Sequence, residues 1–139
     1  MALSFSKMFK PKTTTVPSDL LDKIEYTEGT KFAENKTNKI YIDIEELGGF
    51  PYLKTVIIGD IQENIKRTGC TITFVFKDEE ITLTSDNTTV ESNQIKKTGI
   101  FYTPIDFELD ESEAKKIRTK KVIEVKYTFK KNSYCFKTV

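Results

Sequence analysis

The chain has 139 residues, close to the commonest size of a single domain, and contains 22 Lys or Arg against 21 Asp or Glu. This near-neutral charge predicts no strong general attraction to nucleic acid or to an anionic membrane. No stretch approaches the roughly 20 apolar residues that a membrane-spanning helix needs, so we expect no membrane span.

The first segment, residues 1–17, is polar and contains two prolines, Pro11 and Pro17. Proline interrupts both helices and central strands, so we interpret this segment as a flexible N-terminal tail. Its lysines are not followed by a continuous apolar run, which argues against a secretory signal and favours a cytoplasmic location. Residues 18–139 are predicted to form a single β-rich domain, which begins with a short helix capped by Ser18.

The strand pattern starts at Lys39, where isoleucines at positions 40, 42 and 44 alternate with polar or aromatic residues. Gly48 and Gly49 are predicted to end this strand in a turn rather than to bind phosphate, and Pro51 reinforces the break. Residues 53–58 are rich in β-branched side chains and predict a second strand.

Residues 60–68 admit two interpretations. Asp60 and Glu63 have the spacing of a helix capping box, which favours a short helix. However, Ile61, Glu63 and Ile65 also alternate as in a strand, and the segments on both sides are predicted strands. We therefore favour an extended connection.

A hairpin is predicted next, with strands at residues 72–76 and 81–83 around a polar turn. The polar residues 85–93 indicate a loop or a weak edge strand. A further strand follows Gly99 and ends with residues 105–109, which place apolar and acidic side chains on opposite faces. The chain closes with a second hairpin, formed by residues 123–129 and 134–139, in which Ile123 is expected on the buried face.

A short helix is predicted at residues 110–118, between the strand that ends with residues 105–109 and the closing hairpin. Asp110 has the character of an N-cap and Glu113 completes a capping box, while cations occupy the final turns. The whole pattern indicates a mainly β fold, α+β at most. We expect an antiparallel sandwich or a partly open barrel with this one short helix.

Histidine is absent, which excludes Ser-His-Asp and Cys-His catalysis and every metal site that uses imidazole. The two cysteines, Cys70 and Cys135, are far apart in the sequence, so a structural zinc site is not expected. We interpret them as reduced thiols packed in the core, although one disulfide stays possible. No catalytic, metal or cofactor-binding residue is assigned, and no cofactor is expected.

Carboxylates are the remaining candidates for catalysis. Asp106, Glu108 and Asp110 alternate on one strand face, where they could form a glycosidase-type pair or bind a divalent cation. The opposite face carries Ile105, Phe107 and Leu109, so the acidic face is expected to point to solvent.

The C-terminal region is basic, with nine Lys or Arg against three Asp or Glu from Glu111 to Val139. Single-strand nucleic-acid binders combine such cations with exposed aromatic platforms. Here Tyr127 and Phe129 share the face of Val125, which indicates that they belong to the core, and we favour solvated or edge-protecting lysines. The candidate contacts with an anion or nucleic acid are Lys115, Arg118, Lys120, Lys121, Lys126 and Lys130.

Two segments, GCTITFVFKDEEITLTS (residues 69–85) and YTPIDFELDESEAKKIRTKKVIEVKYTF (residues 102–129), resemble a pattern in small uncharacterised bacterial proteins. The pattern is a strand pair around an acidic turn, an alternating strand, an acidic-capped helix and a final basic strand. The resemblance covers roughly the last 70 residues and implies a mainly β or α+β fold, with no functional residue attached.

These observations lead to one main hypothesis, a non-enzymatic interaction or ligand-binding domain. A sheet edge would contact a protein partner or a second copy of the chain. Two alternatives stay open: a single-stranded nucleic-acid binder that uses the basic C-terminal region, and a carboxylate- or metal-dependent enzyme.

Overall fold

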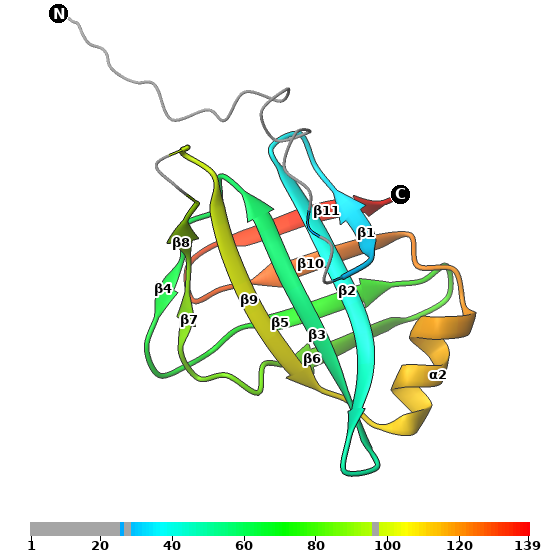
Figure 1. Cartoon of the computed structure of the whole chain (residues 1–139). Helices are drawn as coiled ribbons and strands as arrows, with labels where there is room; N and C mark the ends of the chain where they lie inside the picture. The colour runs from blue at the N-terminus through cyan, green and yellow to red at the C-terminus, as the bar shows by residue number, and fades with distance from the viewer. Residues whose placement is uncertain (1–25, 27–28, 96–97) are drawn as a thin grey trace, which may run out of the picture.

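The computed structural model describes residue 26 and residues 29–95 and 98–139, and its main element is a curled antiparallel sheet (Figure 1). The predicted mainly β fold, a partly open barrel, is confirmed, and the described residues include one short helix, near residues 110–118 as expected. The predicted tail at residues 1–17 and the helix from Ser18 lie outside the described residues. No helix in the described ranges is long and apolar enough to cross a membrane.

The large sheet has the strand order β6-β5-β10-β11-β1-β2-β3-β9-β8, and a separate small sheet pairs β4 with β7. All neighbouring strands in both sheets are antiparallel. The strands are β1 (Lys31–Glu34), β2 (Asn38–Leu47), β3 (Phe50–Gly59), β4 (Asn64–Ile65), β5 (Thr71–Val75), β6 (Glu80–Thr84), β7 (Val90–Glu91), β8 (Asn93–Gln94), β9 (Phe101–Glu108), β10 (Glu124–Thr128) and β11 (Ser133–Thr138).

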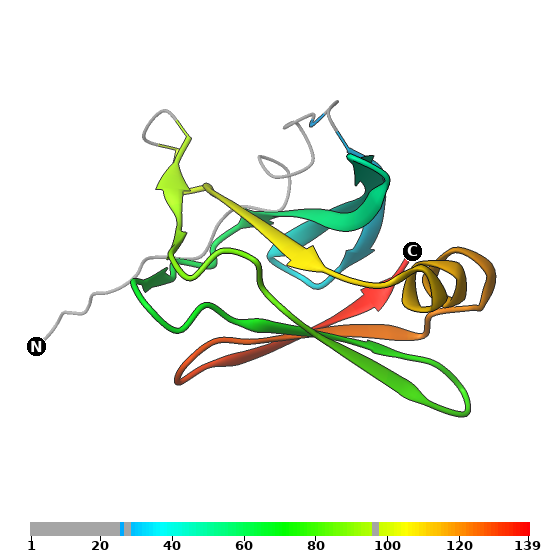
Figure 2. The ribbon, with the colours of Figure 1, turned by 90° about the horizontal axis from the view of Figure 1, so that it is seen from below.

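The sheet curls until its two sides face each other. Strands β5, β6, β10 and β11 form one side and β2, β3 and β9 form the other, with the helix at one end (Figure 2). An isolated bridge between Ser85, just after β6, and Phe107 in β9 joins the two sides. Most of the buried hydrophobic residues therefore lie between them.

The interior contains large side chains from both sides of the curl, including the fully buried Phe74, Phe107, Tyr127 and Phe136. The Tyr127 ring packs edge-on against Phe107 and Phe136, with ring centroids 6.1 and 5.8 Å apart. The prediction that the aromatic face of the last hairpin belongs to the core is thus confirmed for Tyr127 and Phe129.

The prediction that Ile123 lies on the buried face of that hairpin is wrong. Ile123 is exposed, whereas its neighbour Val122 is buried. The Ile123 amide donates to the Val75 carbonyl, although Val75 already faces Glu124 in the register. One extra residue at the start of β10 therefore shifts the alternation, as in a β-bulge.

The hairpin of β2 and β3 turns at Gly48 and Gly49, whose φ angles are +60° and +85°. Both values lie in the left-handed region that glycine adopts without strain, which confirms the predicted turn. The expected break at Pro51 is wrong, since β3 already starts at Phe50. At Pro51 the strand pairs with β2 alone, because the pairing with β9 begins at Tyr52. The missing N–H of the proline therefore costs no hydrogen bond to a second neighbouring strand.

A smaller apolar cluster covers the outer face of β2, β3 and β9. Tyr41, Val56, Ile58 and Ile100 are buried there, and Tyr26 packs against Tyr41 with ring centroids 5.0 Å apart. The alternation in β2 suggested only one apolar face. Tyr41 is nevertheless buried, because residues distant in sequence cover this second face.

The helix α2 (Glu111–Thr119) begins as predicted. The Asp110 carboxylate accepts a hydrogen bond from the Glu113 amide at 2.7 Å, and the Glu113 carboxylate accepts one from the Asp110 amide at 2.9 Å. Ala114 and Ile117 are its buried residues, so the helix packs on the core through this narrow stripe.

Residues 60–68 are extended around the short strand β4, which confirms the interpretation favoured from the sequence. Ile61, Glu63 and Ile65 are all buried, as their alternation indicates. The two cysteines are free, as predicted, but only Cys70 is buried. Cys135 is exposed, because it lies on the outer face of β11 between the inward-facing Tyr134 and Phe136, so its predicted place in the core is wrong.

Candidate functional site

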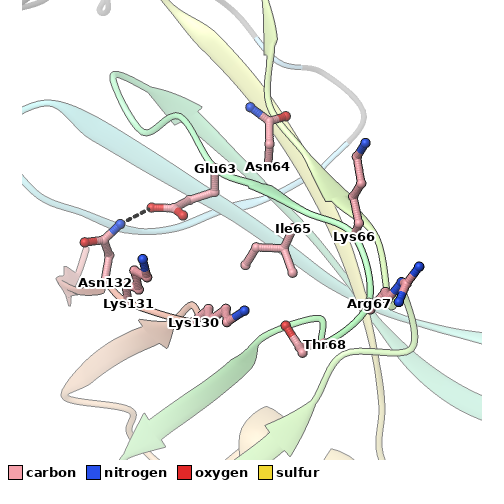
Figure 3. A pocket seen from close by; sticks show the side chains of 9 residues that line it. All are labelled: Glu63, Asn64, Ile65, Lys66, Arg67, Thr68, Lys130, Lys131 and Asn132. Carbon is pink, nitrogen blue, oxygen red and sulfur yellow. Dashed lines mark hydrogen bonds between the residues drawn. The ribbon is translucent and has the colours of Figure 1, made fainter.

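A cavity of about 420 Å³ opens between the segment around β4 and the turn that joins β10 to β11 (Figure 3). Four cationic residues line it, Lys66 and Arg67 from the first segment and Lys130 and Lys131 from the second. In the view of Figure 3, the Lys66 and Arg67 side chains lie at the rim and extend away from Lys130 and Lys131. We call this cavity the cationic cleft. The remaining lining residues are Glu63, Asn64, Ile65, Thr68 and Asn132.

The four cations of the cleft are exposed, and none of them forms an ion pair within the described part of the chain. Lysines near the helix behave differently. The Glu79 carboxylate binds both Lys116 and Lys120, and Asp78 binds Lys120 as well. The positive charge of the cleft is therefore available to a ligand, whereas part of the charge near α2 is already neutralised.

Glu63 connects the two sides of the cleft. Its Oε2 atom accepts hydrogen bonds from Asn132 Nδ2 at 2.9 Å and from the Tyr134 hydroxyl at 2.7 Å. The side chain is only 8% exposed, so these donors replace the water that its carboxylate would otherwise bind. Burial, and then the hydrogen bond to Glu63, raise the pKa of Tyr134, which keeps its hydroxyl protonated as a donor.

Hydrogen bonds with Thr88 and Thr89, just before β7, fix the loop that carries Lys66 and Arg67. Thr89 Oγ1 donates to the Lys66 carbonyl at 3.2 Å, and the Gly69 amide donates to the Thr88 carbonyl at 3.0 Å. Gly69 has a φ of +61°, and a Cβ there would meet Ser85 Oγ at 2.2 Å. Glycine therefore lets the chain turn closely past Ser85 into β5.

The six cations named from the sequence do not form one site. Lys130 lines the cationic cleft, whereas Arg118, Lys120 and Lys121 line a separate cavity of about 320 Å³ beside the C-terminal end of α2. Lys115 is exposed on the helix, and Lys126 lies in β10 opposite Thr73 and Cys135.

Lys66 and Arg67 were missed by the sequence interpretation. They belong to the segment 60–68, more than half the described chain away from Lys130, and only the packing brings them beside it. The sequence did contain a signal for them. Ile61, Glu63 and Ile65 alternate as the buried positions of an extended segment, so the Lys66-Arg67 pair that follows is expected in an exposed loop.

The carboxylates proposed for an enzyme are also divided. Asp106 and Glu108 line a different cavity, together with Asp86, whereas Asp110 caps the helix. Asp106 is half-buried and Glu108 is exposed, so the predicted solvent-facing side of β9 is largely confirmed. Within the described ranges, no group of three or more Asp, Glu, Cys or His side chains is arranged to hold a metal ion.

Comparison of the chain with protein-family models, with curated proteins and with solved structures found no match. The functional argument therefore depends on the geometry of the chain itself.

Proposed function

We propose that this protein is a non-enzymatic binding domain that holds a phosphate-bearing small molecule in the cationic cleft. The observation that carries the proposal is that four cations from two separate loops, none of them in an ion pair with the described residues, line one cavity. Among the lining residues the one carboxylate is that of Glu63, which already accepts hydrogen bonds from Asn132 and Tyr134.

The size and the chemistry of the cleft support this ligand class. A volume of about 420 Å³ lies within the range of small-molecule sites. Arg67 can bind two oxygens of a phosphate at once, while lysines add point charges. Asn64, Thr68 and Asn132 supply neutral polar groups for the rest of the molecule.

The resemblance to small uncharacterised bacterial proteins, which the comparisons leave untested, attaches no other activity to the chain. The enzyme alternative likewise stays a hypothesis. It would require Asp106 and Asp110 to act together, although Asp110 is engaged as the helix N-cap.

The first test is an NMR titration of the ¹⁵N-labelled full chain with inorganic pyrophosphate. We expect amide shifts concentrated at residues 64–68 and 130–132, and an affinity that falls as salt is added. The double variant Lys66→Gln/Lys130→Gln should weaken binding at least about tenfold. The control Lys115→Gln/Lys121→Gln makes the same charge change outside the cleft and should bind as the wild type does. Equal loss in both variants, or no shifts at millimolar pyrophosphate, would overturn the proposal.

A single-stranded oligonucleotide is the comparison probe for the nucleic-acid alternative. No aromatic side chain lines the cleft, and Tyr127 and Phe129 are buried, so the described residues offer no stacking platform there. We therefore expect weak retention that scales only with charge. Tight retention of the oligonucleotide together with no response to pyrophosphate would favour the nucleic-acid binder instead.

A further inference from the structure

A second cavity, of about 510 Å³, lies beside the tip of the β2–β3 hairpin and differs from the cationic cleft in both charge and lining. Its walls combine apolar or aromatic side chains with three carboxyl groups. We call it the acidic groove; its lining residues are Leu47, Phe50, Pro51, Tyr52, Leu109, Asp86, Asp106 and Glu108.

Two large apolar side chains at this groove are exposed to solvent. Leu47 and Phe50 are 75% and 76% exposed, the highest values among the large hydrophobic residues that the structure describes. They face each other across the glycine turn, at the tip of the hairpin that extends past the other strands (Figure 1). Paired exposed hydrophobics beside a cavity are typical of a surface that a partner covers.

The carboxyl groups are held close together by the backbone. The Asp86 amide donates to the Asp106 carbonyl at 2.8 Å, and the Asp106 amide donates to Asn87 Oδ1 at 2.8 Å, which fixes the loop after β6 against β9. Hydrogen bonding and repulsion from Asp86 raise the pKa of Glu108. Burial raises the pKa of Asp106, and Lys54, its neighbour in the register, opposes the shift. The negative charge of the groove is thus incompletely balanced.

We infer that the acidic groove docks an extended segment of a partner protein that carries Lys or Arg and large apolar side chains on the same face, at every second residue. The cations would lie among Asp86, Asp106 and Glu108, and the apolar side chains would cover Leu47, Phe50 and Leu109. This inference is independent of the proposed anion site.

Charge and shape separate this occupant from the alternatives. The carboxyl groups disfavour an anionic lipid surface or a nucleic acid, although Leu47 and Phe50 alone would suit a membrane. A small amine would satisfy the carboxyl groups but would leave the two exposed side chains uncovered. A peptide with both kinds of side chain matches the whole surface.

The test is fluorescence anisotropy of a labelled synthetic peptide with the repeat Lys-Ser-Leu-Ser, which places Lys and Leu on one face of an extended chain, added to the full chain. Two matched peptides replace either every Lys by Glu or every Leu by Ser. We expect binding of the Lys-Leu peptide and at least about tenfold weaker binding of both matched peptides. Equal binding of the Lys-Ser peptide would show a charge effect only and would overturn the inference.

Variants locate the binding. Phe50→Ser and Asp86→Asn/Glu108→Gln should each reduce peptide affinity at least about tenfold. The controls Ile123→Ser and Glu80→Gln/Glu91→Gln make similar changes at exposed positions outside the groove and should have no effect. Pyrophosphate titration of Phe50→Ser should be unchanged, which distinguishes this inference from the anion site. Equal losses in the controls would contradict the inference. So would concentration-dependent dimers that Phe50→Ser abolishes, because a second copy would then occupy the groove.

Discussion

The carboxylate of Glu63 accepts a 2.7 Å hydrogen bond from the hydroxyl of Tyr134, a residue 71 positions later in the chain. Asn132 donates to the same oxygen at 2.9 Å. These contacts join the segment before β4 to the β10–β11 hairpin and so set the two sides of the cationic cleft.

Tyr134→Phe removes one donor from the buried Glu63 carboxylate. A hydrogen bond to a charged group contributes about 1.5–3 kcal/mol, so we expect the free energy of unfolding to fall by about 1–2 kcal/mol, with Asn132 still bound. Urea denaturation measures the change. Gln62→Ala, at an exposed position next to Glu63, should change stability by less than about 0.5 kcal/mol. If Tyr134→Phe were as stable as the wild type, Glu63 would not depend on this contact.

The two cysteines should differ in reactivity. Cys70 is buried, and burial raises its pKa to about 12, so little reactive thiolate forms at neutral pH. Cys135 is exposed on β11. We expect a thiol reagent to modify Cys135 quickly in the native protein and Cys70 only after denaturation. The variant Cys135→Ser is the control and should show almost no native reaction; a fast reaction in this variant would mean that Cys70 is accessible.

Asp110→Ala removes the N-cap of α2. The Asp110 side chain accepts from the Glu113 amide, and loss of such a cap costs about 1 kcal/mol. Chemical denaturation should detect this loss, while Ser112→Ala, at an exposed position in the first turn, should be nearly neutral. An equal effect of both substitutions would contradict the capping role.

Glu79 links the β5–β6 hairpin to the helix end through ion pairs. Hydrogen bonds from Lys120 and then Lys116 hold the pKa of Glu79 below its usual value. A lowered folded-state pKa adds stability above the unfolded-state pKa, and this stability is lost as the pH falls through the folded-state pKa. We therefore expect Glu79→Gln to lower Tm at neutral pH.

In strong acid the Tm difference between Glu79→Gln and the wild type should disappear, because Glu79 is then protonated in the wild type as well. The effect should be modest at this surface and should weaken with salt. Thermal unfolding followed by circular dichroism from pH 2 to 7 measures it. Glu80→Gln is the control without an ion pair; an equal pH dependence in both variants would exclude the Lys120 contact as the cause.

Several features followed from the sequence because local chemistry decides them. The alternation in the hairpins and the turn at Gly48 and Gly49 predicted strands that the structure contains. The capping box of Asp110 and Glu113 predicted the start of the helix, since both partners lie within one turn.

Other features depended on residues that meet only after folding. Ile123 is exposed because one extra residue opposite Val75 shifts the alternation at the start of β10, and no neighbour in sequence signals this shift. Tyr41 is buried because a second apolar cluster covers the outer face of β2. Periodicity reports which side chains share a face, but it does not report what covers that face.

The mainly β class, the capped helix at residues 110–118 and the absence of histidine chemistry were determined by the sequence itself. The curl of the sheet and its register decided which charges meet. They bring Lys66 and Arg67 beside Lys130 and Lys131, and they leave Lys115 and Lys126 elsewhere. The physical reason is that long-range packing sets the distance between loops far apart in the chain, whereas a local pattern specifies only the element that carries each charge.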